Sequence, residues 1–253
     1  GRPQRFLKAH GFTGEVYPIN PGRDEVQGVK AYKSVTDVPG PVDHAFVMVP
    51  AKFVEDAIRD CGAKGVPVAT IYSDGFAETG DDGRKMQERL VATAREVGVR
   101  LIGPNSMGVI HPASSLTLSV NAVLEMDGIK PGGLSLISQS GTILGTLLSR
   151  GAARGIGFAR MIGVGNESDL AVGELVDLLV DDPATKSILL FLEAVRDADK
   201  LAAAARRAYD AGKPVITYKL GRSEAGRELA LSHSGAIAGP AKAADAFFQA
   251  HAI

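Results

Sequence analysis

The chain has 253 residues, of which 45% are hydrophobic and 23% are charged. At about 150 residues per domain this length favours two domains, and the composition excludes a globally disordered chain. The 28 Lys and Arg residues are balanced by 29 Asp and Glu residues, which argues against a broad basic surface for nucleic acid. Cys61 is the only cysteine, so an intrachain disulfide and a cysteine-rich metal site are excluded.

No apolar run approaches the roughly 18 residues that a membrane span needs. The first five residues, Gly1–Arg5, also lack the apolar core of a signal peptide. We therefore predict a cytoplasmic protein that binds neither nucleic acid nor membrane.

Short β-branched runs alternate with amphipathic runs along the chain. The runs typical of strands are Glu15–Ile19, His44–Val49, Val66–Ile71, Arg100–Ile102, Gly133–Ser138, Phe158–Ile162, Ser187–Leu192 and Pro214–Lys219. The runs typical of helices between them are Val54–Gly62, Gly83–Val97, Gly141–Ala153, Leu170–Val180 and Ala198–Ala211. Strands separated by helices of 10–15 residues indicate βαβ units and parallel sheets.

The alternation pauses at 121–133, where Met126–Gly133 is typical of a linker. We predict an α/β fold with two doubly wound domains and mainly parallel sheets, divided into residues 1–126 and 127–253. Both chain ends, Pro3–His10 and Pro240–His251, are typical of helices. Because a doubly wound domain normally begins with a strand and its glycine turn, we expect both domains to be truncated at the chain ends.

Ligands of open parallel sheets bind beyond the carboxyl ends of the strands, so the residues that follow each strand are the site candidates. The stretch Ser138–Thr142 places small hydroxyl residues and a glycine between a strand and a helix. The free N–H groups and the dipole of that helix N-terminus favour an anion. Simple helix capping by Ser140 explains the same residues.

Two further residues fall at the same predicted sheet edge. Glu193 directly follows the apolar run Ile188–Leu192, and His233 lies in the small-residue loop Leu231–Gly239. Taken alone, Glu193 is slightly better explained as a helix cap, and a lone loop histidine such as His233 is more often structural than catalytic. The other four histidines are interpreted as surface or core residues. An imidazole, an orienting carboxylate and a phosphate cradle on one edge together suggest a phosphohistidine.

Eight short motifs occur in a specific order and spacing. They are Tyr17–Gly22, Val49–Ala51, Leu101–Asn105, Gly108–Ile110, Ser138–Thr142, Asp182–Pro183, Glu193 and His233–Ala236. From about Gly11 to Ile253 the chain resembles the α-type half of the NDP-forming acyl-CoA synthetases, the superfamily of succinyl-CoA synthetase and the ADP-forming acetyl-CoA synthetases. The resemblance implies a Rossmann-like CoA-binding first domain and a flavodoxin-like second domain.

The resemblance also implies roles for individual residues. His233 would be the phosphocarrier, and Glu193 would accept a hydrogen bond from its other ring nitrogen. The phosphate-binding residues would be Ser138, Gln139, Ser140, Gly141, Thr142 and Asn166, with Asp169 lining the same mouth. The CoA-binding residues would be Asn20, Pro21, Arg23, Val49, Pro50, Ala51, Tyr72, Ser73, Asp74, Asn105 and Ser106.

In this family a carboxylic acid, CoA and ATP give an acyl-CoA through the phosphohistidine and an acyl phosphate. ATP and Mg²⁺ would be bound by an ATP-grasp partner domain or subunit that these residues do not contain, and a second chain is a family expectation. No metal ligands are predicted in this chain. Gly145 stands where succinate-specific members have a tyrosine, so we expect a roomier acyl pocket that does not suit succinate.

Two alternatives remain at this point. A CoA-sensing regulatory module without ligase activity would need neither Glu193 nor His233. A nicotinamide-dependent dehydrogenase would need a G-x-G-x-x-G loop after a strand, and the sequence contains none.

Overall fold

The computed structural model describes residues 1–220, 241–251 and 253. His233, the predicted phosphocarrier, therefore lies outside the described residues. Within the described part, no helix is both long and apolar enough to span a membrane.

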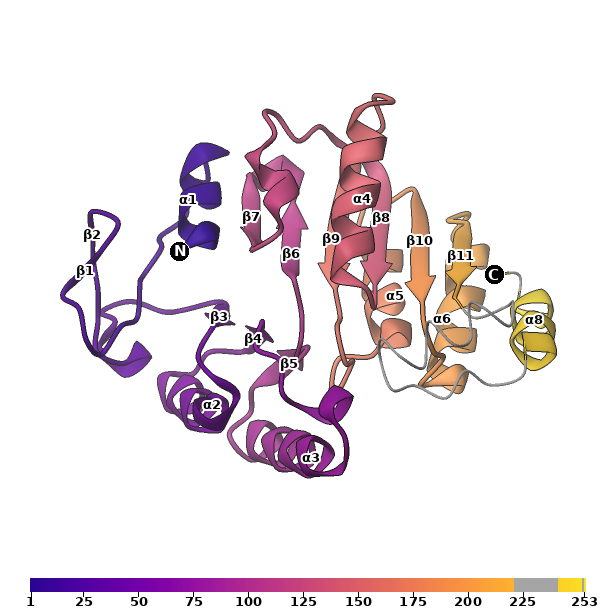
Figure 1. Cartoon of the computed structure of the whole chain (residues 1–253). Coiled ribbons are helices and arrows are strands. Elements are labelled where there is room, and N and C mark those ends of the chain that lie inside the picture. Colours follow the sequence, from indigo (N-terminus) through magenta and orange to yellow (C-terminus); the bar gives the residue numbers. More distant parts are fainter. Residues whose placement is uncertain (221–240, 252) are drawn as a thin grey trace.

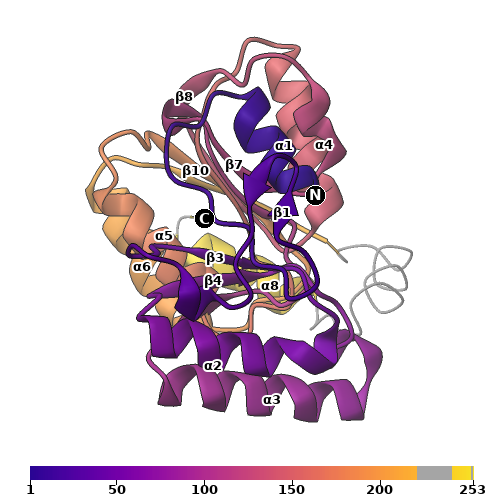
Figure 2. The ribbon, with the colours of Figure 1, turned by 90° about the vertical axis from the view of Figure 1, so that its left-hand side faces the viewer.

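The first part of the chain builds a parallel sheet of three strands over two helices (Figure 1). Its elements are α1 (Arg2–Ala9), β1 (Glu25–Val26), β2 (Val29–Lys30), β3 (Ala45–Val47), α2 (Val54–Lys64), β4 (Val68–Ile71), α3 (Asp81–Glu96) and β5 (Arg100–Ile102). Strands β3, β4 and β5 pair in chain order, and β1 and β2 form a separate antiparallel pair. Figure 2 shows α2 and α3 side by side below the three-stranded sheet.

The second part builds a sheet of six strands in the order β11-β10-β8-β9-β6-β7. Its elements are β6 (Gly108–His111), β7 (Leu116–Ser119), β8 (Pro131–Ser138), α4 (Gly141–Ala152), β9 (Phe158–Gly163), α5 (Val172–Asp181), β10 (Ser187–Leu192), α6 (Ala198–Asp210), β11 (Val215–Lys219) and α8 (Ala241–Ala250). Strands β8 to β11 are parallel, whereas β6 runs antiparallel to β9 and to β7. The carboxyl ends of β8, β9 and β10 consequently meet at one edge.

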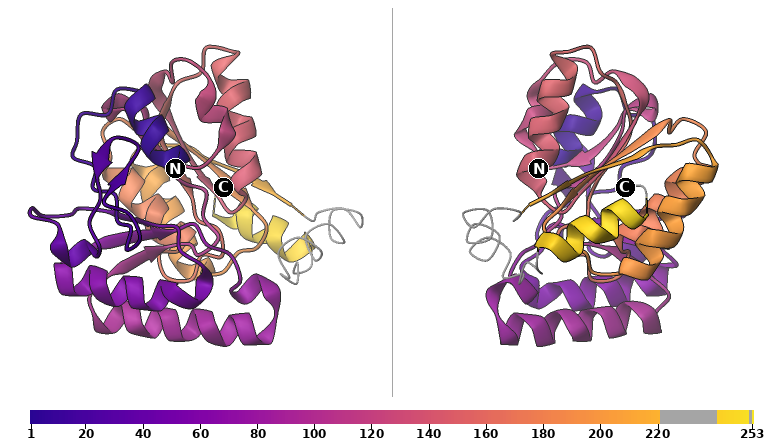
Figure 3. Two further views of the ribbon diagram at one scale, coloured as in Figure 1. Left: turned by 60° about the vertical axis from the view of Figure 1, so that its left-hand side comes forward. Right: turned by 90° about the vertical axis from the view of Figure 1, so that its right-hand side faces the viewer.

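Helices cover both faces of the six-stranded sheet (Figure 2). Helices α1 and α4 bury Phe6, Leu144 and Leu148 against one face, in a core with Leu136 and Met161. Helices α5 and α6 cover the opposite face, and Figure 3 shows α8 beside them. The buried side chain of Phe248 joins α8 to that core.

Helical periodicity explains which residues these helices bury. In α4, Leu144, Leu148 and Gly151 recur at spacings of four and three, which gives one apolar stripe. Side chains of α5 are buried on a wider face because the helix packs against both the sheet and α6. Apolar strands covered from both sides lack the alternation of half-exposed strands, as Ile188–Leu192 in β10 illustrates.

Most predicted strands and helices are present within a few residues, but the strand expected at Glu15–Ile19 is wrong. Only a single bridge forms there, from Ile19 to Tyr32. Pro18 and Pro21 cannot donate hydrogen bonds, and the chain turns immediately after Asn20, so no ladder can extend.

The pause at 121–133 contains a short 3-10 helix over Ala122–Glu125, and β8 already begins at Pro131. The hairpin of β6 and β7 was not predicted. It precedes the expected linker yet pairs with β9, so the larger sheet includes strands from both sides of residue 126. The division at residue 126 stays a prediction.

Candidate functional site

A cavity of about 160 Å³ opens where the two sheets meet, at the carboxyl ends of β8, β9 and β10. It is lined by Glu78, Asn105, Met107, Gln139, Ser140, Gly141, Thr142, Gly165, Asn166, Glu193 and Arg196. The first three come from the part of the chain up to residue 112, and the others follow strands β8, β9 and β10. The cavity is thus formed by loops that lie far apart along the chain.

The N-terminus of α4 forms one wall of the cavity. Ser140 is the N-cap residue, and its Oγ accepts the N–H of Ile143 at 3.5 Å. A Cβ atom on Gly141 would lie 1.9 Å from Cγ of Met107, so the missing side chain lets the helix begin directly against Met107. The first N–H groups of a helix have no intrahelical partners, which makes this wall suited to a phosphoryl group.

Glu193 lies at the opposite wall, directly after β10, with an exposed fraction of 7%. The Gln139 side chain fixes its backbone, because Oε1 of Gln139 accepts the N–H of Glu193 at 2.6 Å and that of Ala194 at 3.0 Å. Lys219 Nζ donates to the Glu193 carbonyl at 2.7 Å. Burial lowers the pKa of Lys219, and the Glu193 charge partly opposes this effect.

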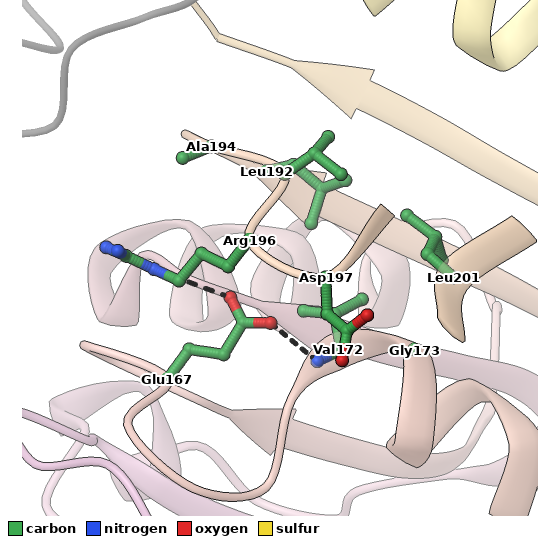
Figure 4. A pocket seen from close by; sticks show the side chains of 9 residues that line it. Glu167, Val172, Gly173, Leu192, Ala194, Arg196, Asp197 and Leu201 are labelled. Atoms are coloured by element: carbon green, nitrogen blue, oxygen red, sulfur yellow. Dashed lines mark hydrogen bonds and ion pairs between the residues drawn. The ribbon is translucent and has the colours of Figure 1, made fainter. Parts of the chain in front are cut away.

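Glu167 is a second buried carboxylate behind this wall (Figure 4). Its side chain accepts the N–H of Val172 at 2.7 Å and the amide of Gln139 at 2.5 Å, and Arg196 lies 3.8 Å away. Burial raises the pKa of Glu167 although these partners oppose the shift. Gln139 therefore links Glu167 to the Glu193 loop.

The structure brings together Gln139, Ser140, Gly141, Thr142, Asn166 and Glu193 of the predicted set. Ser138 is the predicted phosphate-side residue that is not among the residues lining the cavity. Ser138 Oγ is buried and donates to the Ser140 carbonyl at 2.7 Å, so it braces the loop from behind the cavity. Gln139 lines the cavity, and both ends of its side-chain amide make the contacts just described, so it also braces the loop.

Asp169 does not line the cavity, contrary to the prediction. Its carboxylate accepts the N–H of Leu101 at 2.8 Å and pairs with Arg100 at 2.9 Å. The side chain is 8% exposed and faces the junction of the two halves. Asp169 thereby joins the loop after β9 to strand β5.

The predicted CoA residues after β3 and β4 lie side by side. Ser73 Oγ donates to the Val49 carbonyl, and the N–H of Asn105 donates to the Ser73 carbonyl at 2.9 Å. Asn105 lines the cavity, so this row leads into it. Tyr72 and Val49 are exposed by 38% and 36%, which leaves apolar surface for a ligand.

The remaining predicted CoA residues take different positions. Pro50, Ala51 and Asp74 flank the same row, and Ser106 is buried, with its Oγ donating to the Gly163 carbonyl. Asn20, Pro21 and Arg23 form a separate turn before β1, anchored by the N–H of Asn20 on Tyr32. Of the predicted CoA residues, those after β3 and β4 therefore form the row that leads into the cavity.

Gly145 does not open the expected roomier pocket. A Cβ atom at Gly145 would lie 2.4 Å from Oδ1 of Asn121, so the Asn121 side chain already fills that space. Asn121 Nδ2 donates to the Gly141 carbonyl at 3.0 Å, and Oδ1 accepts the N–H of Val123 at 3.1 Å. Asn121 thus supports the first turn of α4.

Several residues of the site were not predicted from the sequence: Glu78, Met107, Glu167, Arg196, Asn121 and Lys219. Arg196 lies within a few residues of the end of β10, and that position was the available signal, whereas Glu78 lies in a 3-10 helix beyond the loop after β4. Met107 and Asn121 precede or follow the hairpin of β6 and β7, which the sequence pattern did not reveal. Within residues 1–220 and the described C-terminal part, no group of three or more His, Cys, Asp or Glu side chains could hold a metal ion.

Two protein families match the chain. A CoA binding domain matches residues 2–112, and a Succinyl-CoA ligase like flavodoxin domain matches residues 131–253. The alpha subunit of ADP-forming acetate–CoA ligase I from Pyrococcus furiosus is 39% identical over 247 residues, covering 96% of this chain and 52% of that relative. The ADP-forming 4-hydroxybutyrate–CoA ligase of Nitrosopumilus maritimus is 33% identical over 241 residues, covering 95% of this chain and 34% of that relative.

Among solved structures, acetyl-coenzyme A synthetase 1 of Ca. Korarchaeum cryptofilum, in complex with phosphate and ADP, matches with a TM-score of 0.90 at 35% identity. The match covers 98% of this chain and 52% of that chain, so this chain spans about half of its neighbour. Fold and families define a Rossmann-like CoA-binding domain followed by a flavodoxin-like domain, as predicted. The chain belongs to the NDP-forming acyl-CoA synthetases of the succinyl-CoA synthetase superfamily.

Proposed function

We propose that this chain is the CoA-binding and phosphohistidine part of an ADP-forming acyl-CoA synthetase. The observation that carries the proposal is the cavity, where Glu193, the N-terminus of α4 and the Asn105 end of the CoA-side row converge. The relatives named above are ligases, and the comparisons give the regulatory module no support.

His233 carries the phosphoryl group in this proposal. Glu193 accepts a hydrogen bond from the second ring nitrogen, which orients the imidazole and stabilises its positive charge. The phosphoryl group has a charge near -2, and the N–H groups of Gly141 and Thr142 with the dipole of α4 offset it. Ser140 keeps that helix end in place.

Two transfers then complete the reaction. A carboxylate oxygen of the acid attacks phosphorus, the P–N bond breaks, and an acyl phosphate and free His233 result. The sulfur of CoA attacks the acyl carbon as its thiol proton is lost, the C–O bond to phosphate breaks, and inorganic phosphate leaves. Splitting the reaction in this way avoids a single step with three substrates.

The remaining partners follow from this chemistry. CoA lies along the row formed by Val49–Ala51, Tyr72–Asp74 and Asn105, with its thiol toward the cavity. An ATP-grasp domain or subunit binds ATP and Mg²⁺ and phosphorylates His233. The assembly works in the cytoplasm, where ATP and CoA are both available.

The test uses the complete protein with its ATP-grasp domain or subunit. Thioester formation from ATP, CoA and a panel of carboxylic acids, including acetate and 4-hydroxybutyrate, is measured for the wild type, Glu193→Gln and Glu88→Gln. We expect Glu193→Gln to lose about 100-fold or more in kcat. Glu88, an exposed glutamate on α3, serves as the matched control and retains the wild-type rate. Absence of thioester with every acid, or a fully active Glu193→Gln variant, contradicts the proposal.

A further inference from the structure

Glu78 joins two loops that belong to different halves of the molecule. It lies in the 3-10 helix Ala77–Thr79, just after the CoA-side loop 72–76. Its Oε1 accepts the N–H of Gly75 at 2.6 Å and that of Phe76 at 3.0 Å. Its Oε2 accepts a hydrogen bond from Nδ2 of Asn166, in the loop 163–169 that follows β9. One carboxylate therefore binds both loops.

Asn166 makes further hydrogen bonds besides the one to Glu78. Its Nδ2 also donates to Oε1 of Gln87 on α3 at 3.0 Å, and its N–H donates to the Pro104 carbonyl at 2.9 Å. Ser168, in the same loop, donates its N–H to the Gly103 carbonyl at 3.1 Å. Both protons of the Asn166 amide are thus used by groups from the CoA-side half.

The charge on Glu78 strengthens the contact. Burial acts to raise the pKa of this carboxyl, but the hydrogen bonds from Asn166, Phe76 and Gly75 outweigh it and hold the pKa below its ordinary value. Glu78 is therefore ionised near neutral pH. Hydrogen bonds to an ionised acceptor are roughly twice as strong as those between neutral groups.

We propose that Glu78 is a positioning residue, which holds the CoA-side loop 72–76 and the phosphate-side loop 163–169 in register across the cavity. The inference rests on the proposed function, because it concerns the step in which the CoA thiol meets the acyl phosphate. Glu78 acts through Gly75, Phe76 and Asn166. A misplacement of about 1 Å between reacting groups can cost about 100-fold in rate.

The two halves of the reaction depend differently on this contact. Phosphorylation of His233 uses Glu193 and the N-terminus of α4, which Gln139 and Ser140 hold without Glu78. Attack by CoA needs the loops on both sides of the cavity in place. Loss of Glu78 should therefore slow thioester formation while phosphorylation continues.

The experiment measures both half-reactions in the complete protein with its ATP-grasp domain or subunit. Phosphoenzyme formation from γ-labelled ATP is followed first, and formation of acyl-CoA from the isolated phosphoenzyme, CoA and the accepted acid is followed second. Glu78→Gln is compared with Glu88→Gln, which makes the same charge change at an exposed position on α3. Gln at position 78 retains an oxygen for the N–H groups of Gly75 and Phe76.

We expect Glu78→Gln to form phosphoenzyme at the wild-type rate, to form acyl-CoA from it about 10-fold more slowly and to show a raised KM for CoA. Glu88→Gln should match the wild type in both steps. Normal acyl-CoA formation from the phosphoenzyme in Glu78→Gln, or an equal loss of both half-reactions, would overturn the positioning role. Failure of the wild type itself to form phosphoenzyme would count against the proposed function, and the two failures are thus distinguished.

Discussion

The side-chain amide of Gln139 makes four hydrogen bonds, to Glu167, to the N–H groups of Glu193 and Ala194, and to the Ala194 carbonyl. Replacement by leucine would leave two backbone N–H groups without acceptors and would remove one hydrogen-bond donor from the buried Glu167 carboxylate. Each such buried group costs about 1–3 kcal/mol. Gln139 thus stabilises the fold and also holds the backbone of Glu193 in place.

We predict that Gln139→Leu lowers the free energy of unfolding by about 3 kcal/mol. Urea titration of the variant and of the wild type measures the loss. Gln249→Leu, at an exposed position on α8, is the control and should change stability little. A Gln139→Leu variant as stable as the control would show that the four contacts are not formed in solution.

The second residue-scale prediction concerns pH. Burial raises the pKa of Glu167 above the ordinary value of 4.5, so the folded state holds this proton more tightly than the unfolded state. The contribution of this bound proton to the free energy of unfolding is fully present below pH 4.5 and is lost as the pH rises through the folded-state pKa of Glu167. Glu167→Gln removes this dependence.

The difference in free energy of unfolding, Glu167→Gln minus wild type, should therefore increase as the pH is raised above about 4.5 and then level off. Urea titrations at several pH values from acidic to neutral measure it. A difference that stays flat or declines across this range would mean that the Glu167 carboxyl is not buried as described.

At the scale of elements, α4 depends on its contact with the segment before β8. Gly145 faces Asn121 so closely that a methyl group there would displace the Asn121 side chain and its hydrogen bond to the Gly141 carbonyl. Glycine inside a helix is otherwise unfavourable by about 1 kcal/mol relative to alanine. Whether Gly145→Ala raises or lowers the free energy of unfolding therefore depends on the side chain at position 121.

We predict that Gly145→Ala destabilises the chain by about 1–3 kcal/mol through overpacking. In an Asn121→Ala background the same substitution should instead stabilise α4 by up to about 1 kcal/mol. Thermal unfolding of the four variants of this double-mutant cycle measures both values. Equal effects in the two backgrounds would contradict the packing of Gly145 on Asn121.

At the scale of the whole molecule, the two halves are joined by more than the covalent chain. Arg100 on β5 pairs with Asp169 at 2.9 Å and with Glu174 on α5 at 2.8 Å. The antiparallel pairing of β6 with β9 continues the junction. From these contacts we predict that the two halves of the chain unfold in one cooperative transition.

Arg100→Met would leave the largely buried Asp169 carboxylate without its cation. We expect a loss of about 2 kcal/mol in the free energy of unfolding. Arg95→Met, at an exposed position near the end of α3, is the matched control. An unchanged stability in Arg100→Met would show that the junction does not depend on this ion pair.

The extent to which the sequence predicted the molecule differs between local and long-range features. Strands such as Ser187–Leu192 and the helix from Gly141 were predictable because periodicity and capping are local signals. The β6–β7 hairpin consists of two four-residue strands, too short for a clear period, and its place in the larger sheet depends on β9.

The site shows the same division. Strand-end positions predicted that Glu193 and Ser140 lie at one sheet edge, because the topology of a parallel sheet determines where its ligands bind, and both line the cavity. The role of Gln139 as a brace could not be predicted, since it depends on Glu167, 28 positions away. Asp169 was misassigned for a similar reason, since its partner Arg100 belongs to the other half of the molecule.

The most direct test of the central claim is phosphorylation of the complete protein with γ-labelled ATP, with His233→Ala and His111→Ala as variants. His111 lies in the β6–β7 hairpin, where Ser114 is its hydrogen-bond partner, and it serves as the matched histidine control. The account predicts an acid-labile, base-stable label in the wild type and in His111→Ala, absent from His233→Ala and discharged by CoA together with a carboxylic acid. A label that persists in His233→Ala, or no label in the wild type, would contradict it.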